Sequence, residues 1–265
     1  MADSRSPTSR AESSAPVDAM TGDAPLAAGT VDGGLVDKDA IGGGIIDLVG
    51  VDRARVDAEL ARLCASDVVG ALRAPVAEAI RYSILGQGKR LRPILMLAAY
   101  RACGGEADAS ALAACIEVVH AYSLVHDDLP CMDDDDMRRG RPTTHRVYGV
   151  AIATAAGVAM VPLAVRAACD AAAQLGLPYA SQAAIVRELM RASGGGGMVG
   201  GQLLDLEGEG SSLSIEQLER IHSAKTGALI SASARIGGIA ANASDAGLDA
   251  LTTYGDAIGL AFQIA

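Results

Sequence analysis

Six aspartates lie within ten residues near the middle of the chain, and three arginines follow them at once. They are Asp127, Asp128, Asp133, Asp134, Asp135 and Asp136, followed by Arg138, Arg139 and Arg141. Carboxylates this close repel one another, so a folded protein keeps them ionised only with a cation or with full solvation. Mg²⁺ is usually held by one or two carboxylates, waters and phosphate oxygens, and a guanidinium group is a preferred partner of phosphate. The segment therefore predicts a site that binds Mg²⁺ and a diphosphate.

A solvated loop and a calcium loop are the two alternative interpretations of the acidic run. Blocks of like charge are commonly exposed. Here, however, the run directly follows apolar residues at helical spacing, among them Leu112, Ile116, Val119 and Val125, and this pattern is typical of a helix that packs into a core. The run also lacks the spaced aspartates, central glycine and closing glutamate of an EF-hand. The acids are expected to extend from a buried helix.

The segment from Asp127 to Asp133, with Arg138-Arg139-Gly140 behind it, resembles the first aspartate-rich motif of the trans-prenyl diphosphate synthases. Its spacing is similar to that of bacterial farnesyl and of plant and bacterial geranylgeranyl diphosphate synthases. Further motifs stand in the order typical of the family: Gly88-Lys89-Arg90-Leu91-Arg92-Pro93, Gly200-Gly201-Gln202 with Asp205, Lys225-Thr226-Gly227 and Ala261-Phe262-Gln263-Ile264. The resemblance covers about residues 50 to 265.

Helices must position these motifs. Half of the residues are apolar, only seven are aromatic and none is tryptophan, which favours helix-on-helix packing. Apolar residues at a spacing of three to four predict helices near residues 52–70, 73–85, 90–102, 108–127, 150–175, 180–205, 214–240 and 245–265. The predicted fold class is all-α, a single-domain helical bundle around a central cavity. The resemblance implies the isoprenoid synthase type of this bundle.

The breaks between the predicted helices are marked by turn and capping residues. Cys103-Gly104-Gly105 closes one helix, Leu175-Gly176-Leu177-Pro178 separates two others, and Ser214 with Gln217 predicts a capping box. The uncharged stretch from Val147 to Val165 approaches the length of a membrane span. Its alanines, glycines and Pro162 favour a pair of buried helices broken near Pro162, and no stable membrane insertion is expected.

Charge and cysteine content restrict the location and the partners. Residues 1–44 are rich in Ala, Ser, Gly, Asp and Pro and are expected to form a disordered tail, which leaves residues 45–265 as the folded domain. The net charge of −10 excludes nucleic acid as a general partner. The tail has no secretory or transit pattern, and the five separated cysteines predict neither zinc nor disulfides. The protein is expected in the cytoplasm.

The resemblance implies an enzyme that condenses isopentenyl diphosphate with an allylic diphosphate. Magnesium and basic groups would stabilise the departing diphosphate. Asp127 and Asp133 are expected to bind Mg²⁺ directly, while Asp128 binds metal waters or adds a further contact. Because Pro130 interrupts the helix, a local bend must bring these carboxylates together.

The remaining basic and polar motif residues are assigned to the two diphosphates. Arg138 resembles the allylic-diphosphate contact and Arg139 the isopentenyl-diphosphate contact. Lys89, Arg92 and His120 match the other isopentenyl-side positions. Lys225 and Thr226 match the family's later diphosphate-side and cation-stabilising pair, Gln202 and Asp205 are placed to reach one site together, and Gln263 belongs to the last motif.

Tyr122 lies five positions before Asp127, about one and a half helical turns upstream. A ring there would stop chain growth early, which favours farnesyl diphosphate over geranylgeranyl diphosphate as the product. Packing in the core is the alternative role of this tyrosine. The resemblance also implies a homodimer.

Two features depart from the family pattern. The sequence stops at Ala265, where a second aspartate-rich motif is expected, so we expect a truncated form that lacks half of its metal ligands and is impaired. Val158 stands where an aspartate is usual in the segment after the arginines. A geranylgeranyl diphosphate synthase and a non-catalytic partner subunit of a prenyl synthase therefore stay open as alternatives. A terpene cyclase would not need Lys89, Arg92 and Arg139, so the presence of these residues argues against a cyclase.

Overall fold

The structure, a computed structural model, describes residues 38–208, 210 and 212–264, and the described residues from Asp39 onward form one compact unit. The tail expected over residues 1–44 lies mostly outside the described residues, and the first helix begins at Lys38, within that range. The helices of the first half are α1 (Lys38–Cys64), α2 (Asp67–Gly70), α3 (Ala74–Ile84), α4 (Leu91–Ala102) and α5 (Ser110–Asp127). Those of the second half are α6 (Thr144–Tyr148), α7 (Val150–Gln174), α8 (Tyr179–Ser193), α9 (Met198–Gly208), α10 (Ile215–His222), α11 (Ala228–Ala240) and α12 (Asp245–Ile264).

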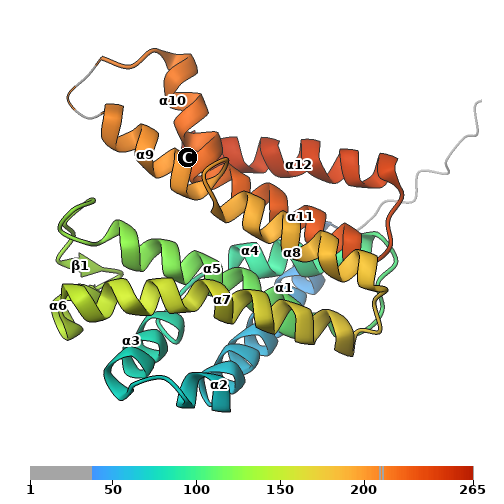
Figure 1. Cartoon of the computed structure of the whole chain (residues 1–265). Helices are drawn as coiled ribbons and strands as arrows, with labels where there is room; N and C mark the ends of the chain where they lie inside the picture. Colours follow the sequence, from blue (N-terminus) through green and yellow to red (C-terminus); the bar gives the residue numbers. More distant parts are fainter. Residues whose placement is uncertain (1–37, 209, 211, 265) are drawn as a thin grey trace, which may run out of the picture. The chain divides into compact units, whose positions relative to one another are not determined.

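The helices pack on one another around an aliphatic core, which confirms the all-α prediction. Helix α5 packs against α7, and α11 packs against α4, α8 and α12 (Figure 1). The largest fully buried side chains come from seven of these helices and include Leu60, Ile80, Met96, Ile116, Met160, Ile185 and Ile236. Each helix buries one apolar face, so the burial follows the three-to-four spacing of the sequence.

The predicted helix ends are confirmed at three places. Helix α4 ends at Ala102, just before the two glycines, and α7 ends at Gln174, before Gly176 adopts φ 69°. The Ser214 side chain accepts a hydrogen bond from the Gln217 amide at 3.2 Å, and the Gln217 side chain accepts one from the Ser214 amide at 2.8 Å. This reciprocal pair begins α10 as a capping box.

The predicted break near Pro162 is wrong, because α7 continues through it from Val150 to Gln174. Proline removes the hydrogen bond to the carbonyl four residues earlier, that of Val158. Both residues are exposed, so water can replace the missing donor. By length and composition alone α7 could cross a membrane, as the core helices of soluble proteins also could, and one of its faces is buried against α5.

Two long predicted helices are interrupted. Residues 180–205 divide into α8 and α9 at the four glycines from Gly194 to Gly197, since glycine is a poor helix former. Residues 214–240 contain a π-helical segment, η1 (Ser223–Gly227), between α10 and α11. A two-stranded hairpin of β1 (Met137–Arg138) and β2 (Arg141–Pro142) also forms after the acidic run, with Arg138 opposite Arg141. No strand pattern in the sequence predicted it.

Candidate functional site

The acidic run begins where α5 ends and the chain folds back on itself. Asp127 is the last residue of α5, and the amide of Asp133 donates a hydrogen bond to its carbonyl at 2.9 Å. The amide of Met132 donates to the Leu129 carbonyl at 2.8 Å, across Pro130. This turn is the local bend that the proline predicted, and it places the backbones of Asp127 and Asp133 side by side.

Two later elements complete what we call the acidic site, formed by Asp127, Asp133, Gln202 and Lys225. Gln202 on α9 donates from Nε2 to Asp133 Oδ1 at 2.9 Å. Lys225 in η1 has its Nζ 4.0 Å from Asp133 Oδ2 and 2.6 Å from Asp205 Oδ2. Sequence-predicted residues from three distant segments therefore meet here, and Asp205 joins them through the lysine.

The close approach of α9 to η1 depends on Gly201. A β-carbon added at this position would lie 2.2 Å from the backbone nitrogen of Lys225, a distance that real contacts do not reach. Only glycine fits at position 201, and the close packing that it permits lets Gln202 and Lys225 reach the same carboxylate. The π-helical turn, a feature frequent at functional sites, presents Lys225 to α9.

Charge in the acidic site is not balanced by the protein alone. The pKa of Asp127 is raised to about 6, mainly by burial and also by Asp133 and Asp128, while Lys225 and Arg138 oppose the rise. The Oε1 atom of Gln202 is buried and has no hydrogen-bond partner among the described residues. An added cation with oxygen ligands would relieve both conditions, so the donor set fits Mg²⁺.

The protein donors do not form a complete metal site. Within the part of the chain that the structure describes, no three acidic, cysteine or histidine side chains are grouped to hold a metal ion. Mg²⁺ commonly takes only one or two protein carboxylates and completes its shell with waters and phosphate oxygens. Asp127 and Asp133 fit that pattern.

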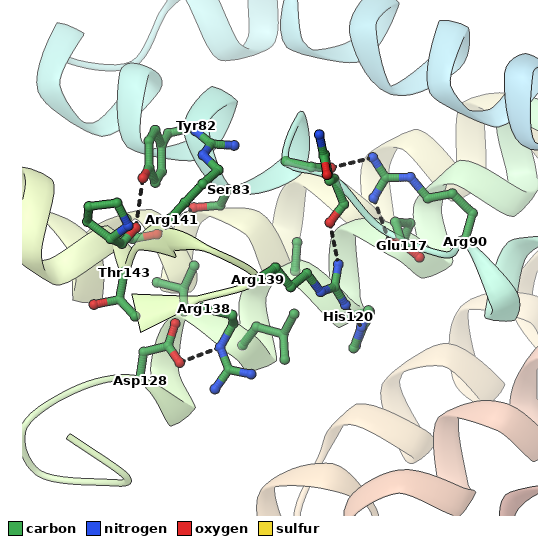
Figure 2. Close-up of a pocket in the computed structure, with 17 residues that line it drawn as sticks. Tyr82, Ser83, Arg90, Glu117, His120, Asp128, Arg138, Arg139, Arg141 and Thr143 are labelled. Atoms are coloured by element: carbon green, nitrogen blue, oxygen red, sulfur yellow. Dashed lines mark hydrogen bonds and ion pairs between the residues drawn. The ribbon is translucent and has the colours of Figure 1, made fainter. Parts of the chain in front are cut away.

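Asp128 is paired with an arginine of the hairpin. It is buried, and its Oδ1 accepts a hydrogen bond from Nε of Arg138 at 2.5 Å (Figure 2). Nη2 of Arg138 also donates to Asp135 at 3.1 Å. Burial raises the pKa of Asp128, and the arginine opposes that rise. A buried carboxylate requires a partner, and strand β1 brings Arg138 to it. In the structure, therefore, the side chain of Asp128 contacts the hairpin, and the guanidinium group of Arg138 binds Asp128 and Asp135.

A largely apolar cavity of about 270 Å³ adjoins the acidic site, and we call it the apolar cavity. Its polar lining includes Asp127, Gln202 and Lys225, and its other walls are Tyr122, Ser123, His126, Met132, Met198, Val199, Leu203 and Leu206. Tyr122 is buried, packs edge-to-face on His126 with ring centres 5.5 Å apart, and donates from its hydroxyl to the Ser193 carbonyl at 3.3 Å. Its ring is therefore fixed in the cavity wall.

A second cavity, of about 580 Å³, is positively charged, and we call it the basic cavity. Its lining includes the predicted residues Lys89, Arg92, His120, Arg139 and Thr226, together with Arg53, Gln87, Gly88, Arg90, Leu91, Glu117 and Phe262. Five of these side chains are basic and one is acidic. The structure thus brings together all of the isopentenyl-side positions that the sequence assigned, and its charge favours an anion.

His120 lies between two arginines of the basic cavity. Its Nε2 is 3.4 Å from Nη1 of Arg92 and 3.5 Å from Nη2 of Arg139. Burial, followed by Arg92 and Arg139, holds the pKa of His120 well below its usual value. The imidazole is therefore neutral, and it can lie beside both guanidinium groups without charge repulsion.

A buried ion-pair network supports the loop that carries Lys89. Arg90 adopts φ 52° and donates to Glu117 at 2.7 Å and to Asp57 at 2.8 Å. Its Nη2 donates to the Gly86 carbonyl at 2.9 Å, and Arg139 donates to the Gln87 carbonyl at 2.8 Å (Figure 2). These bonds fix the loop backbone to α1, α5 and the hairpin.

Seven residues of the basic cavity were not assigned from the sequence, and among them are the charged or aromatic residues Arg53, Arg90, Glu117 and Phe262. The sequence could have identified Glu117 as a candidate site residue, because it is a charged residue within an apolar helix, three positions before His120. Nothing in the sequence distinguishes Arg53 as a site residue, since its neighbours on α1 include other exposed charged residues.

The remaining sequence-predicted positions have simple placements. Lys225 and Thr226 are consecutive, yet Lys225 lines the apolar cavity and Thr226 lines the basic cavity, so both cavities border η1. The side chain of Gln263 lies outside the described residues. Val158 is 60% exposed on α7 and lines neither cavity.

Comparisons with known proteins agree with this geometry. The family model of polyprenyl synthetases matches residues 73–265. The chain is 47% identical over 197 residues to the farnesyl diphosphate synthase of Escherichia coli, covering 72% of this chain and 64% of that protein. It is 43% identical over 199 residues to a heterodimeric geranylgeranyl pyrophosphate synthase large subunit of Arabidopsis thaliana, covering 73% of this chain and 54% of that one.

Solved structures show the same fold. An FPP/GFPP synthase from Zymomonas mobilis superposes with a TM-score of 0.74 at 34% identity, covering 82% of this chain and 78% of that chain. A geranyltransferase from Legionella pneumophila gives 0.70 at 37% identity, with 81% and 78% covered. This chain spans about half to two thirds of the length of the curated relatives named above.

Proposed function

Because the chain belongs to the polyprenyl synthetase family, we propose that the whole protein elongates an allylic diphosphate with isopentenyl diphosphate. The observation that carries the proposal is that two cavities of different character border consecutive residues, the apolar cavity at Lys225 and the basic cavity at Thr226. A donor with a diphosphate and an apolar tail fits the acidic site and the apolar cavity. An acceptor diphosphate fits the basic cavity.

In the proposed reaction the allylic C–O bond breaks and its electron pair leaves with the diphosphate. The double bond of isopentenyl diphosphate supplies the electrons of the new C–C bond, and a proton is then lost. Asp127 and Asp133 would hold Mg²⁺, which would neutralise charge on the departing diphosphate. Lys225 adds a fixed positive charge beside the same carboxylates, and the apolar walls exclude water from the reacting carbon.

The basic cavity would orient the acceptor. Arg139 is fixed by its bond to Gln87, and Arg92 lies beside neutral His120, so the guanidinium groups are in place before a diphosphate binds. Such preorganisation lowers the entropic cost of bringing two substrates together. Lys89, on the supported loop, completes the set.

We also propose that Tyr122 limits product length and favours farnesyl over geranylgeranyl diphosphate. Its buried ring forms part of the wall of the apolar cavity. Tyr122→Ala should yield longer products by radio-thin-layer chromatography or mass spectrometry. Tyr122→Phe, which keeps the ring and removes the hydroxyl, should keep the wild-type length. If both variants gave the wild-type distribution, the ring would have no part in length control.

Incubation with isopentenyl diphosphate plus dimethylallyl or geranyl diphosphate tests the reaction itself. We expect an elongated allylic diphosphate, with one inorganic diphosphate released for each isopentenyl diphosphate consumed. Cyclic hydrocarbons without consumption of isopentenyl diphosphate would indicate a cyclase. No turnover alone, but turnover with a second prenyl synthase subunit, would indicate the partner-subunit alternative.

The quaternary state and the location are further parts of the proposal. We propose a homodimer, to be tested by the mass in light scattering, and a monomer at all concentrations would exclude it. Every cysteine of the chain is free in the structure, which supports a reducing compartment such as the cytoplasm.

A further inference from the structure

Helix α1 lies outside the region that the family model matches, yet it contributes to the basic cavity. The matched region begins at residue 73, and α1 spans Lys38–Cys64. Arg53 is the residue of α1 that lines this cavity, in the company of Lys89, Arg92 and Arg139. The wall of the cavity is therefore completed by a segment that the family match does not cover.

Two ion pairs fix the part of α1 that carries Arg53. Asp52 is buried and accepts two hydrogen bonds from Arg101 of α4, at 2.6 and 3.1 Å. Four residues beyond Arg53, Asp57 accepts a hydrogen bond from buried Arg90 at 2.8 Å. These bonds lie on either side of Arg53 along the helix, so its backbone is held at the cavity.

The guanidinium group of Arg53 is accessible to a ligand. Its Nε is 4.0 Å from Oδ2 of Asp57, at the limit of an ion pair, whereas Oδ1 of Asp57 is bound closely by Arg90. The side chain of Arg53 is 52% exposed. A weak, solvent-exposed pair of this kind contributes little stability, so a phosphate can displace it at small cost.

The acidic side chain in the cavity lining does not neutralise Arg53. Glu117 is bound to Arg90 at 2.7 Å, and both groups are buried. Arg53 and Lys89 are exposed, whereas Arg92 and His120 are more deeply placed. The basic cavity therefore has a positive outer part formed by Arg53 and Lys89, where an incoming diphosphate first meets the protein.

We propose that Arg53 is a substrate-binding residue that captures the diphosphate entering the basic cavity. The inference rests on the proposed function, since that function assigns isopentenyl diphosphate to this cavity. It extends the function by making α1 part of the binding site. An exposed charge acts mainly through steering and a screened contact, so its effect should weaken as salt increases.

Isothermal titration calorimetry with isopentenyl diphosphate tests this, at ionic strengths of about 0.05 M and about 0.3 M. Arg53→Gln should weaken binding about three- to fivefold at low salt and less at high salt. Arg53→Lys should recover part of the loss. Arg55→Gln is the matched control, because it removes the same charge from an exposed residue of the same helix that does not line the cavity.

Arg139→Gln distinguishes a failure of the role of Arg53 from a failure of the assignment of isopentenyl diphosphate to the basic cavity. If Arg139→Gln weakens binding while Arg53→Gln matches Arg55→Gln, the role of Arg53 is overturned and the proposed function stands. If Arg139→Gln also leaves binding unchanged, the assignment of the cavity itself fails. Equal losses in Arg53→Gln and Arg55→Gln would show an effect of net charge alone and would also overturn the inference.

Discussion

The acidic site and the basic cavity are neighbours, and the first has an excess of negative charge whereas the second has an excess of positive charge. In the acidic site, the partly buried carboxylate of Asp127, with a raised pKa, lies near a second carboxylate, and one lysine offsets them. In the basic cavity, four arginines and a lysine surround one glutamate, and the histidine between them is neutral. The first arrangement is completed by a cation and the second by an anion. A reaction between two diphosphates, one of which must leave with its charge neutralised, needs both.

Removing a carboxylate from the acidic site should have the largest effect. Asp127→Ala should lower the elongation rate by about 10²- to 10³-fold, because it removes a metal ligand and electrostatic stabilisation of the leaving group. Steady-state turnover measures it. Asp134→Asn is the control: this exposed aspartate adopts φ 49°, which asparagine tolerates, and it should keep wild-type turnover. Equal activity in Asp127→Ala and wild type would contradict the metal assignment.

Removing a charge from the basic cavity should act on substrate binding instead. Arg139→Gln should raise the KM for isopentenyl diphosphate about ten- to hundredfold, as expected for loss of a charged hydrogen bond, with a smaller change in kcat. Arg146→Gln, on α6, removes an exposed arginine paired with Asp136 and should change neither constant. A change in kcat alone would place Arg139 at the leaving group and would erase the distinction between the two regions.

The smallest expected effect is the pH dependence of stability that arises from His120. The folded state holds the pKa of His120 below the unfolded value of about 6.5, so the unfolded state binds the extra proton first as pH falls. The stability contributed by neutral His120 is therefore present above about pH 6.5 and is lost at lower pH.

Urea unfolding of wild type and His120→Gln at about pH 7.5 and about pH 5.5 measures this contribution, since glutamine does not titrate. Wild type should lose more stability between the two pH values than the variant does. A larger loss in the variant would show that His120 is protonated in the folded state.

The sequence predicted those parts of both regions that depend on local patterns. Pro130 predicted the bend that joins Asp127 to Asp133, and the family resemblance of the motifs implied that Lys89, Arg92, His120 and Arg139 would share a site. The helix ends at Gly104 and Ser214 followed from turn and capping chemistry, which acts within a few residues.

The sequence did not predict features that depend on tertiary packing. The π-helical turn at Lys225 forms against α9, where Gly201 permits contact, and nothing in residues 223–227 alone requires it. The unbroken α7 tolerates Pro162 because that side of the helix is exposed. The pairing of Asp128 with Arg138 requires the hairpin, and the place of Arg53 requires the docking of α1 through Asp52 and Asp57.

The central claim is that carboxylates of the acidic site bind a diphosphate through magnesium. Calorimetry of a bisphosphonate, titrated into the protein with Mg²⁺ and then with EDTA, tests it most directly. We expect saturable binding that requires Mg²⁺ and disappears in Asp127→Ala but persists in Asp134→Asn. Binding of equal strength with and without Mg²⁺, or binding retained in Asp127→Ala, would contradict the account.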